Sequence, residues 1–370
     1  MTVRPFSFGD MVVAPGELAH GWFELAALST GHVERLPVTI LHGRAPGPVL
    51  WLTANIHGDE VTGLSVVHAL VGADLLSELR GTIVAIPTLN PAGLHTRRRE
   101  SFLDRRDPNR LFPGFPDEPG ADHERPSVLE VGYARLFAEL RRADLLVDLH
   151  CYGLRAGCFV IRDRVLWRRE DERPEALELA RRLEQLCAWT HLPIVNEVPA
   201  RRYLDAKLHR STSGAALLQA KIPAITVELG LTGGVDPAAR AIGIAAVLNV
   251  LRGAGMLPGQ PAPIAGLRVP PLPFPVMRDL VPRARATGIL HYLVEPGDVV
   301  RIGDRLATLS DIHGRPFAGG EILAEHDGWI LALPRGAVCF EGEAVVHMAV
   351  RDDGPLAEKD PTVESAASFR

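Results

Sequence analysis

The sequence predicts an α/β layer fold followed by a small all-β domain. Up to residue 255, short apolar runs typical of buried strands alternate with longer segments of helical periodicity. This alternation indicates a mixed, mostly parallel sheet with helices on both faces. A proline-rich stretch at 259–275 follows, and residues 276–351 contain only short β-type runs separated by glycine turns.

The chain of 370 residues is therefore divided into four parts. The α/β domain is expected over residues 1–258, of which 1–45 form a β-rich lead-in. A linker is expected at 259–275 and the small β domain at 276–351. The polar segment 352–370 is expected to be a disordered tail.

The elements of the α/β domain are assigned from periodicity. Continuous apolar runs predict four buried strands, within 47–58, 81–91, 144–153 and 222–230. Spacing of three and four residues between apolar positions predicts four helices, within 60–79, 127–143, 174–190 and 237–255. Pro174 and Pro237 lie near the starts of the last two helices, where a proline is tolerated.

Two stretches of the β domain, 288–309 and 328–349, resemble each other. Each reads as an apolar strand, two glycine turns and a second strand, which is similar to a barrel-sandwich hybrid of the biotinyl/lipoyl type. Carrier domains of that type place a modifiable lysine on the hairpin between the halves. The hairpin here, 310–320, has no lysine, so a structural or oligomerisation role is expected instead.

Composition excludes several classes of protein. The chain is 46% hydrophobic and 23% charged, as in ordinary globular proteins, and its net charge of -5 argues against a nucleic-acid partner. It has no apolar run long enough for a membrane span, and no secretory signal is expected, because residues 1–10 lack an apolar core. Its four cysteines form no C-x-x-C pair and are expected to be reduced thiols in a cytoplasmic protein.

Three side chains suggest a metal site at one edge of the predicted sheet. His57 and Glu60 follow the strand within 47–58, and His150 ends the strand within 144–153. The carboxyl ends of neighbouring parallel strands meet at one edge, and two histidines with one carboxylate suit a single catalytic Zn²⁺. A lone H-x-x-E is a weak signal, because Glu60 also fits the first turn of a helix. His150 makes the zinc hypothesis the stronger one.

Two carboxylates accompany this set. Glu228 ends an apolar strand, where a carboxylate is costly unless it is paired or functional. It is the natural general base, which takes a proton from water and returns it to the leaving amine; a salt bridge to an arginine is the alternative. Asp148 lies on the same face of its strand as His150 and either orients that histidine or makes a simple structural hydrogen bond.

The motifs "NIHGDE", "TLNPAG", R-x4-D-x4-"NRLFPG", "DLH" and "TVELG" occur in this order over residues 48–255. Together they resemble the succinylglutamate desuccinylase/aspartoacylase family, which is related to the zinc carboxypeptidases. The resemblance implies a zinc-carboxypeptidase-like catalytic domain. The β domain after the linker is similar to the C-terminal domain of bacterial members.

The resemblance also implies residue roles. His57, Glu60 and His150 match the zinc ligands, and Glu228 matches the general base. Residue roles on the substrate side fall in the arginine-rich loop 89–114. There Asn109 and Arg110 match the pair that holds the substrate carboxylate, and Arg99 matches the arginine that polarises the scissile carbonyl. Arg97 and Arg98 precede Arg99, so this last match can shift by one or two residues.

Three functions remain open on the sequence. The first is zinc-dependent hydrolysis of the amide bond of a small carboxylate-bearing substrate such as an N-acyl amino acid. The second is a carboxypeptidase-like peptidase that acts on acidic peptides or isopeptides. The third is a non-catalytic metal-binding or scaffolding protein, which would leave Glu228 without a reason to accompany the ligands. The expected partner is a small carboxylate, with a homo-oligomer as a further possibility.

Overall fold

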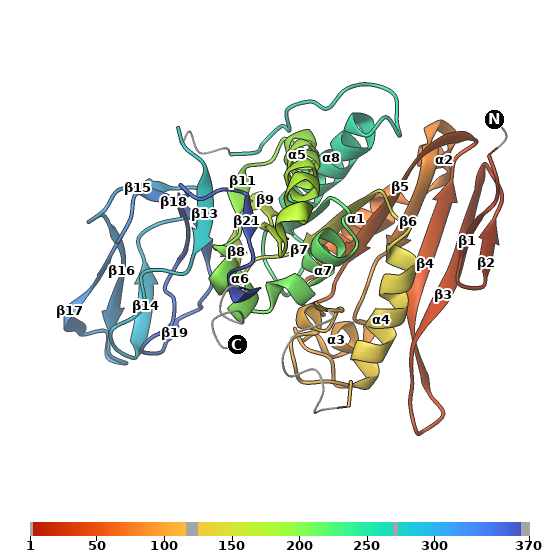
Figure 1. The fold of residues 1–370 in the computed structure, drawn as a ribbon. Coiled ribbons are helices and arrows are strands. Elements are labelled where there is room, and N and C mark those ends of the chain that lie inside the picture. Colours follow the sequence, from red (N-terminus) through yellow and green to blue (C-terminus); the bar gives the residue numbers. More distant parts are fainter. Residues whose placement is uncertain (1–2, 116–124, 269–272, 364–370) are drawn as a thin grey trace.

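One mixed β-sheet of 13 strands runs through the molecule and carries helices on both faces (Figure 1). The computed structural model describes residues 3–115, 125–268 and 273–363. The middle of the sheet holds the four strands that the sequence predicts: β5 (Ala45–Ala54), β6 (Arg80–Ile86), β7 (Leu145–His150) and β12 (Ala224–Leu229). Neighbouring members of this group pair in parallel.

The register of the parallel strands positions the candidate site. Ala54 of β5 is paired with Leu149 of β7, and His150 is paired with Glu228 of β12. The carboxyl ends of β5, β7 and β12 therefore lie side by side. This is the edge at which open α/β sheets bind ligands.

The outer strands pair antiparallel for the most part, so the sheet is mixed and is parallel mainly in its middle. β9 (Cys158–Arg162) runs antiparallel to β12 because it follows β7 after a short connection, whereas a parallel return needs a longer crossover. The other strands of this sheet are β3 (Glu17–Ala27), β4 (Val33–His42), β8 (Arg155–Ala156), β11 (Ile194–Asn196), β13 (Val276–Asp279), β15 (Val299–Val300), β18 (Gly328–Leu333) and β20 (His347–Arg351).

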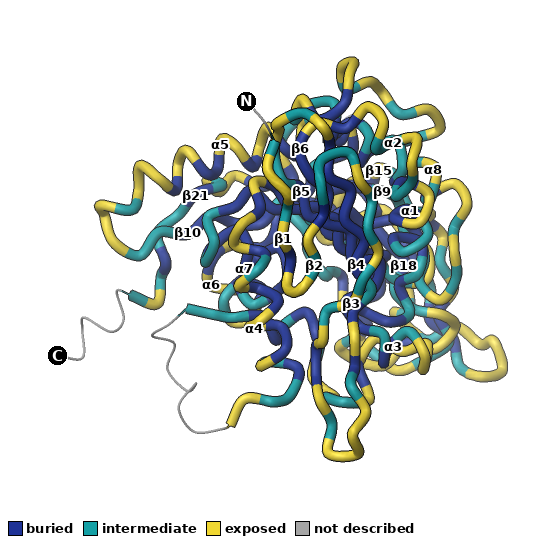
Figure 2. Tube along the Cα trace, turned by 90° about the vertical axis from the view of Figure 1, so that its right-hand side faces the viewer, coloured by how far each residue is buried: buried dark blue, intermediate teal, exposed yellow. Residues whose placement is uncertain are grey.

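Three helices form a layer on one face: α1 (Thr62–Leu70), α5 (Arg173–Thr190) and α8 (Pro237–Gly253). α1 and α8 approach the sheet closely, since a Cβ added at Gly63 would lie 2.7 Å from Leu149 Cβ and one added at Gly243 would lie 2.9 Å from a methyl group of Leu229. The side chain of Leu149 points to this face, so those of Asp148 and His150 point to the opposite face, where α7 (Thr212–Gln219) packs. In Figure 2, β4 is mostly dark blue, as is the second half of β5, whereas α5 alternates between buried and exposed residues as an amphipathic helix does.

Local signals explain where the other helices begin and end. α4 (Val128–Leu140) starts at a capping box, in which Ser127 Oγ accepts from the Glu130 amide and Glu130 Oε2 accepts from the Ser127 amide. The single helix expected within 60–79 is instead two, α1 and α2 (Ala73–Glu78), because the chain is extended at Gly72. The remaining short elements are β1 (Phe6–Phe8), β2 (Met11–Val13), α3 (Pro91–Thr96), η1 (Pro108–Arg110), η2 (Glu170–Glu172), α6 (Ala200–Asp205) and η3 (Leu208–Arg210).

The C-terminal region consists of mostly antiparallel strands in two packed layers. One layer is a separate sheet of β14 (Gly288–Tyr292), β16 (Arg305–Ser310), β17 (Pro316–Leu323) and β19 (Val338–Cys339). The other layer is the end of the large sheet, from β13 to β15. Apolar side chains from both layers, such as Leu290 and Ile330, share one core. The two similar stretches of sequence thus place β14 and β18 in opposite layers.

Two of the expected boundaries are corrected. The region after the linker is joined to the α/β sheet, because β13 pairs with β11 through Asn196 and Met277. The expectation of a disordered tail at 352–370 is wrong up to residue 363. There β21 (Ala357–Lys359) pairs in parallel with β10 (Val165–Trp167). Residues 364–370, and linker residues 269–272, lie outside the described residues.

A buried charge explains why the C-terminal segment is ordered. The side chain of Arg164 is only 1% exposed. Its guanidinium donates to Asp352 Oδ2 at 2.9 Å, to the Pro355 carbonyl at 3.0 Å and to the Glu197 carbonyl at 2.9 Å. A buried arginine needs such partners, so it fixes residues 352–355 to the sheet. Within the described ranges, no helix has the length and hydrophobicity that a membrane crossing requires.

Candidate active site

Asn55 shapes the loop that follows β5. Its backbone is left-handed, with φ of 55°, a conformation that asparagine tolerates better than most residues. Its side-chain amide donates to the carbonyl oxygens of His57, Gly58 and Glu60 at 2.9, 3.2 and 2.9 Å. Thr88 Oγ1 in turn donates to Asn55 Oδ1 at 2.7 Å. The turn that carries His57 and Glu60 is therefore held from its inner side.

A neighbouring loop holds the same turn from outside. A Cβ added at Gly58 would lie 1.9 Å from the carbonyl carbon of Gly93, so only glycine fits there. Asn90 Nδ2 donates to the carbonyl oxygens of Ile56 and Arg99 at 3.0 and 3.3 Å. The "NIHGDE" and "TLNPAG" motifs therefore build one rigid unit.

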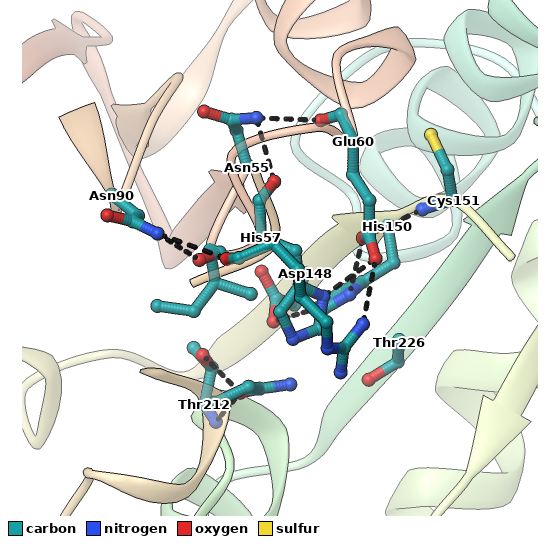
Figure 3. Close-up of polar contacts among 12 residues, drawn as sticks. Asn55, His57, Glu60, Asn90, Asp148, His150, Cys151, Thr212 and Thr226 are labelled. Carbon is teal, nitrogen blue, oxygen red and sulfur yellow. Dashed lines mark hydrogen bonds and ion pairs between the residues drawn. The ribbon is translucent and has the colours of Figure 1, made fainter. Parts of the chain in front are cut away.

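His57, Glu60 and His150 point toward one another at the carboxyl edge of the sheet (Figure 3). His57 Nδ1 lies 2.7 Å from Glu60 Oε1, and His150 Nδ1 lies 2.9 Å from Glu60 Oε2. All three side chains are buried, and one ligand atom of each lies within 4.8 Å of the others. Atoms that each lie about 2 Å from one zinc ion are brought to separations of this order. This donor set could hold a metal ion.

The other ring nitrogen of each histidine is held by a carboxylate. His150 Nε2 lies 2.9 Å from Asp148 Oδ2, and Thr53 donates to Asp148 Oδ1 at 2.6 Å. His57 Nε2 lies 3.1 Å from Asp107 Oδ1. Such contacts fix the ring and leave Nδ1 as the ligand atom. Asp148 was considered for this position on the sequence, whereas Asp107 was not, because its sequence distance from His57 gives no signal.

The cluster is electrically matched. Burial by itself would raise the pKa of Glu60, but the charges and hydrogen bonds of His57 and His150 lower it well below its usual range. Burial by itself would lower the pKa of His150, but Asp148 and Glu60 raise it well above its usual range. The site therefore favours a positive charge between these groups, which is what a divalent cation supplies.

Glu228 lies beside His150 in the register of β7 and β12 and is 4% exposed. Its Oε2 atom is buried and has no hydrogen-bond partner among the described residues. Burial raises the pKa of Glu228 to about 8; His150 opposes this rise and Glu60 adds to it. A divalent cation at the His57–Glu60–His150 cluster would lower this pKa again. An unpaired buried carboxylate at a ligand-binding edge is a candidate proton acceptor.

All seven site residues singled out on the sequence line one cavity of about 100 Å³: His57, Glu60, Arg99, Asn109, Arg110, His150 and Glu228. A larger cavity of about 390 Å³ lies between Arg283 and Phe317 in the C-terminal strands, but none of these side chains lines it. The smaller cavity is therefore the candidate active site.

Arg99 is the one of the three consecutive arginines that lines the cavity. Its guanidinium lies 2.8 Å from Asp107 Oδ2 and 3.5 Å from Glu60 Oε1. Arg97 ends α3 in a left-handed conformation, which turns the chain so that Arg99 faces the loop of His57. Arg99 therefore lies beside the His57–Glu60–His150 cluster.

Asn109 and Arg110 reach the cavity from η1. Asn109 Oδ1 accepts hydrogen bonds from the Thr212 amide at 2.8 Å and from Thr212 Oγ1 at 3.1 Å, so its orientation is fixed. Arg110 donates to the carbonyl oxygens of Ala206 and Asn109 at 2.8 and 2.6 Å. These acceptors orient the guanidinium of Arg110 but do not neutralise it.

Part of the cavity lining has no signal in the sequence. Asp163, Glu197, Ser213 and Thr226 line the cavity from the segment after β9, the end of β11, α7 and β12, and Arg278 reaches it from β13. These residues form no motif, because they come together only through long-range packing. The region after residue 275 thus contributes a charged side chain to the cavity.

Three side chains of α6, those of Arg201, Arg202 and Tyr203, do not line the cavity. Arg201 and Arg202 are exposed on α6, where Arg202 pairs with Asp279. Tyr203 is fully buried in the core beside Gly214.

Comparison with known proteins agrees with the fold and with the family expected from the motifs. The profile of the succinylglutamate desuccinylase/aspartoacylase catalytic domain matches residues 46–254. An N-alpha-acetyl-L-2,4-diaminobutyric acid deacetylase from Halomonas elongata is 27% identical over 318 residues, which cover 85% of each chain. The matched segment contains all seven site residues, and the family resemblance predicted from the motifs is confirmed.

Solved structures show the same fold over nearly the whole chain. A succinylglutamate desuccinylase/aspartoacylase from Rhodobacter sphaeroides superposes with a TM-score of 0.70 at 22% identity, covering 90% of this chain and 96% of that chain. The product-bound ectoine utilization protein EutE (DoeB) from Ruegeria pomeroyi gives a TM-score of 0.71 at 20% identity, covering 94% and 98%. These structures include the C-terminal strands as well as the α/β sheet.

We expect Asp107→Asn to weaken metal binding, because the amide holds His57 Nε2 less well than the carboxylate does. The dissociation constant for Zn²⁺, measured by competition with a chelator, should rise about 10–100-fold. Asp104→Asn is the matched control, because Asp104 pairs with Arg106 nearby and contacts neither histidine. Equal affinities in the two variants would remove Asp107 from the support of the metal site.

Proposed function

The chain belongs to the succinylglutamate desuccinylase/aspartoacylase family, and from that premise we propose that it is a zinc-dependent hydrolase of the amide bond in a small N-acyl amino acid. The observation that carries this proposal is the unpaired carboxylate oxygen of Glu228 beside a buried His57–Glu60–His150 cluster. A purely structural metal site has no need for an adjacent unpaired carboxylate.

His57, Glu60 and His150 would hold the metal, one Zn²⁺ per chain. Two imidazoles and one carboxylate are a ligand set that catalytic zinc uses in proteins. When bound, zinc polarises the scissile carbonyl and makes a water molecule more acidic. Asp107 and Asp148 hold the two imidazole rings in the orientation that this role requires.

Glu228 moves the proton. It accepts a proton from the attacking water, whose oxygen bonds to the acyl carbon. It then delivers that proton to the nitrogen of the leaving amine as the carbon–nitrogen bond breaks. The products are a carboxylic acid and a free amine. A divalent cation at the cluster would lower the pKa of Glu228, so the carboxylate is ionised and can accept the proton.

The arginines act on the substrate. Asn109 and Arg110 anchor the substrate carboxylate, and the carbonyl acceptors of Arg110 hold its guanidinium in place beforehand. Arg99 stabilises the negative charge that develops on the carbonyl oxygen, from its position beside Glu60. Anchoring lowers the entropic cost of reaching the transition state, because the scissile bond is already aligned.

The size of the cavity favours a small substrate. About 100 Å³ suits a short N-acyl amino acid better than a peptide, which was the alternative on the sequence. The relative from Halomonas elongata is a deacetylase of N-alpha-acetyl-L-2,4-diaminobutyric acid, so this compound is the first substrate to test.

A cytoplasmic location is part of the proposal and agrees with four cysteines that form no disulfide. A barrel-sandwich arrangement with an oligomerisation role also remains the proposal for the C-terminal strands.

The test is a screen of N-acyl amino acids and acidic dipeptides with zinc-loaded protein, which reads the release of free amine. We expect release from at least one N-acyl amino acid, and a loss of about 10²–10⁴-fold in kcat for Glu228→Gln. Zinc content and thermal unfolding of this variant should match those of the wild type. Full activity in Glu228→Gln would remove Glu228 from the mechanism, and release from dipeptides alone would favour the peptidase.

Arg110→Ala should impair only substrates that carry a free carboxylate. We expect kcat/KM to fall about 10²-fold on an N-acyl amino acid, because the charge-assisted anchor is lost. On the corresponding N-acyl amino acid amide the change should be small. Arg105→Ala is the matched control, because Arg105 is exposed on the same loop and does not line the cavity. Equal losses of Arg110→Ala on acid and amide would contradict the anchoring role.

A further inference from the structure

Most charged side chains at the cavity are already paired with one another. Arg278 lies 2.7 Å from Glu197, and Arg99 lies 2.8 Å from Asp107. Because the two charges of each pair neutralise each other, these pairs contribute little net charge to ligand binding. Besides Glu228 and the His57–Glu60–His150 cluster, two oppositely charged side chains that line the cavity have no ion-pair partner among the described residues. They are Arg110 and Asp163.

Arg110 is the positive member. Its hydrogen bonds go to the carbonyl oxygens of Ala206 and Asn109, which carry no formal charge. Burial lowers the pKa of Arg110. The charge of Asp107 opposes this shift, and the charge of Arg99 adds to it. A substrate carboxylate would supply the missing negative charge.

Asp163 is the negative member. It lies at the end of β9, is only 4% exposed, and lines the cavity. Its Oδ2 accepts one hydrogen bond, from Ser213 Oγ at 2.8 Å, and Thr226 Oγ1 donates to the same Ser213 Oγ at 3.1 Å. Burial raises the pKa of Asp163 to about 7, and the charge of Glu197 adds to the rise. A buried carboxylate with only a hydroxyl as donor is stabilised by a cation.

The position of Asp163 relative to Glu228 follows from β12. Thr226 and Glu228 lie on the same face of this strand, two residues and therefore about 7 Å apart. Asp163 is linked to Thr226 through Ser213, so it lies along the strand from the proton-transferring carboxylate (Figure 3 shows Thr226 beside the cluster). A cationic group bound to Asp163 would therefore lie along β12 from the scissile bond, because the register pairs Phe159 with Glu228 and Ile161 with Thr226.

We propose that Asp163 is a specificity-determining residue, which selects N-acyl amino acids whose side chain ends in a positively charged amine. The inference rests on the proposed amide hydrolase, and it adds the chemical class of the substrate. The substrate carboxylate binds Arg110, its ammonium group binds Asp163, and the acyl group faces the metal-binding cluster. Both unpaired charges of the cavity are then neutralised by one zwitterionic ligand.

The test compares substrates of equal length with wild-type protein. Nα-acetyl-L-2,4-diaminobutyrate ends in an ammonium group, and Nα-acetyl-L-norvaline ends in a methyl group of the same size. We expect kcat/KM to be about 10–100-fold higher for the cationic compound, since the uncharged one leaves Asp163 unpaired. Equal values would overturn the proposal and leave the hydrolase intact. A preference for Nα-acetyl-L-glutamate would also overturn it, and would indicate a protonated Asp163 that donates to an anion.

Asp163→Asn tests the residue itself. Asparagine keeps an acceptor for Ser213 and removes the charge, so the preference for the cationic substrate should fall at least about tenfold. The loss of kcat/KM should be larger on the cationic substrate than on the norvaline compound, because only the former uses the charge of Asp163. Asp205→Asn is the control, because Asp205 is exposed on α6 outside the cavity. An unchanged preference in Asp163→Asn would contradict the assignment.

Calorimetry with the free amino acids separates this inference from the proposed reaction. We expect 2,4-diaminobutyrate to bind zinc-loaded protein more tightly than norvaline, and Asp163→Asn to remove the difference. If no N-acyl amino acid is hydrolysed but this binding pattern holds, the proposed function fails and the charge selection stands. If the two amino acids bind equally, the charge selection fails whatever the outcome of the screen.

Discussion

The register between β5, β7 and β12 is the constraint on which the site depends. It brings the turn of His57 and Glu60, the end residue His150 and the end residue Glu228 to one edge of the sheet. A shift of one residue in any of these strands would turn the relevant side chains to the opposite face, against α1 and α8. The apolar residues of the three strands fix the register because they must face the buried core.

Electrostatic matching is the second feature that organises the cavity. Carboxylates and cations meet there at low exposure, so each must be neutralised by a neighbour or by a ligand. Arg278 and Glu197 neutralise each other, and Arg278 comes from β13, beyond the linker. The C-terminal strands are therefore part of the cavity wall, and their continuity with the large sheet gives that arginine a fixed position.

The sequence predicted those parts of the molecule that have local signals. Buried strands and polar residues at strand ends are visible in short windows, which predicted the central strands and singled out His57, Glu60, His150 and Glu228. Arg99, Asn109 and Arg110 were assigned only from the family resemblance. The interruption at Gly72 was missed because helical periodicity continues across it. The ordering of residues 352–363, and the roles of Asp107 and Asp163, depend on partners far away in the chain, such as Arg164 and His57. Such pairs have no signature in a single sequence.

The central claim is that one divalent ion binds where three strand ends meet. It is tested most directly by a crystal structure of the zinc-loaded protein, with anomalous data on both sides of the zinc absorption edge. The account predicts one anomalous peak per chain, about 2.0–2.2 Å from His57 Nδ1, His150 Nδ1 and a carboxylate oxygen of Glu60. A zinc-replete crystal with its peak elsewhere, or with no peak among these side chains, would contradict it.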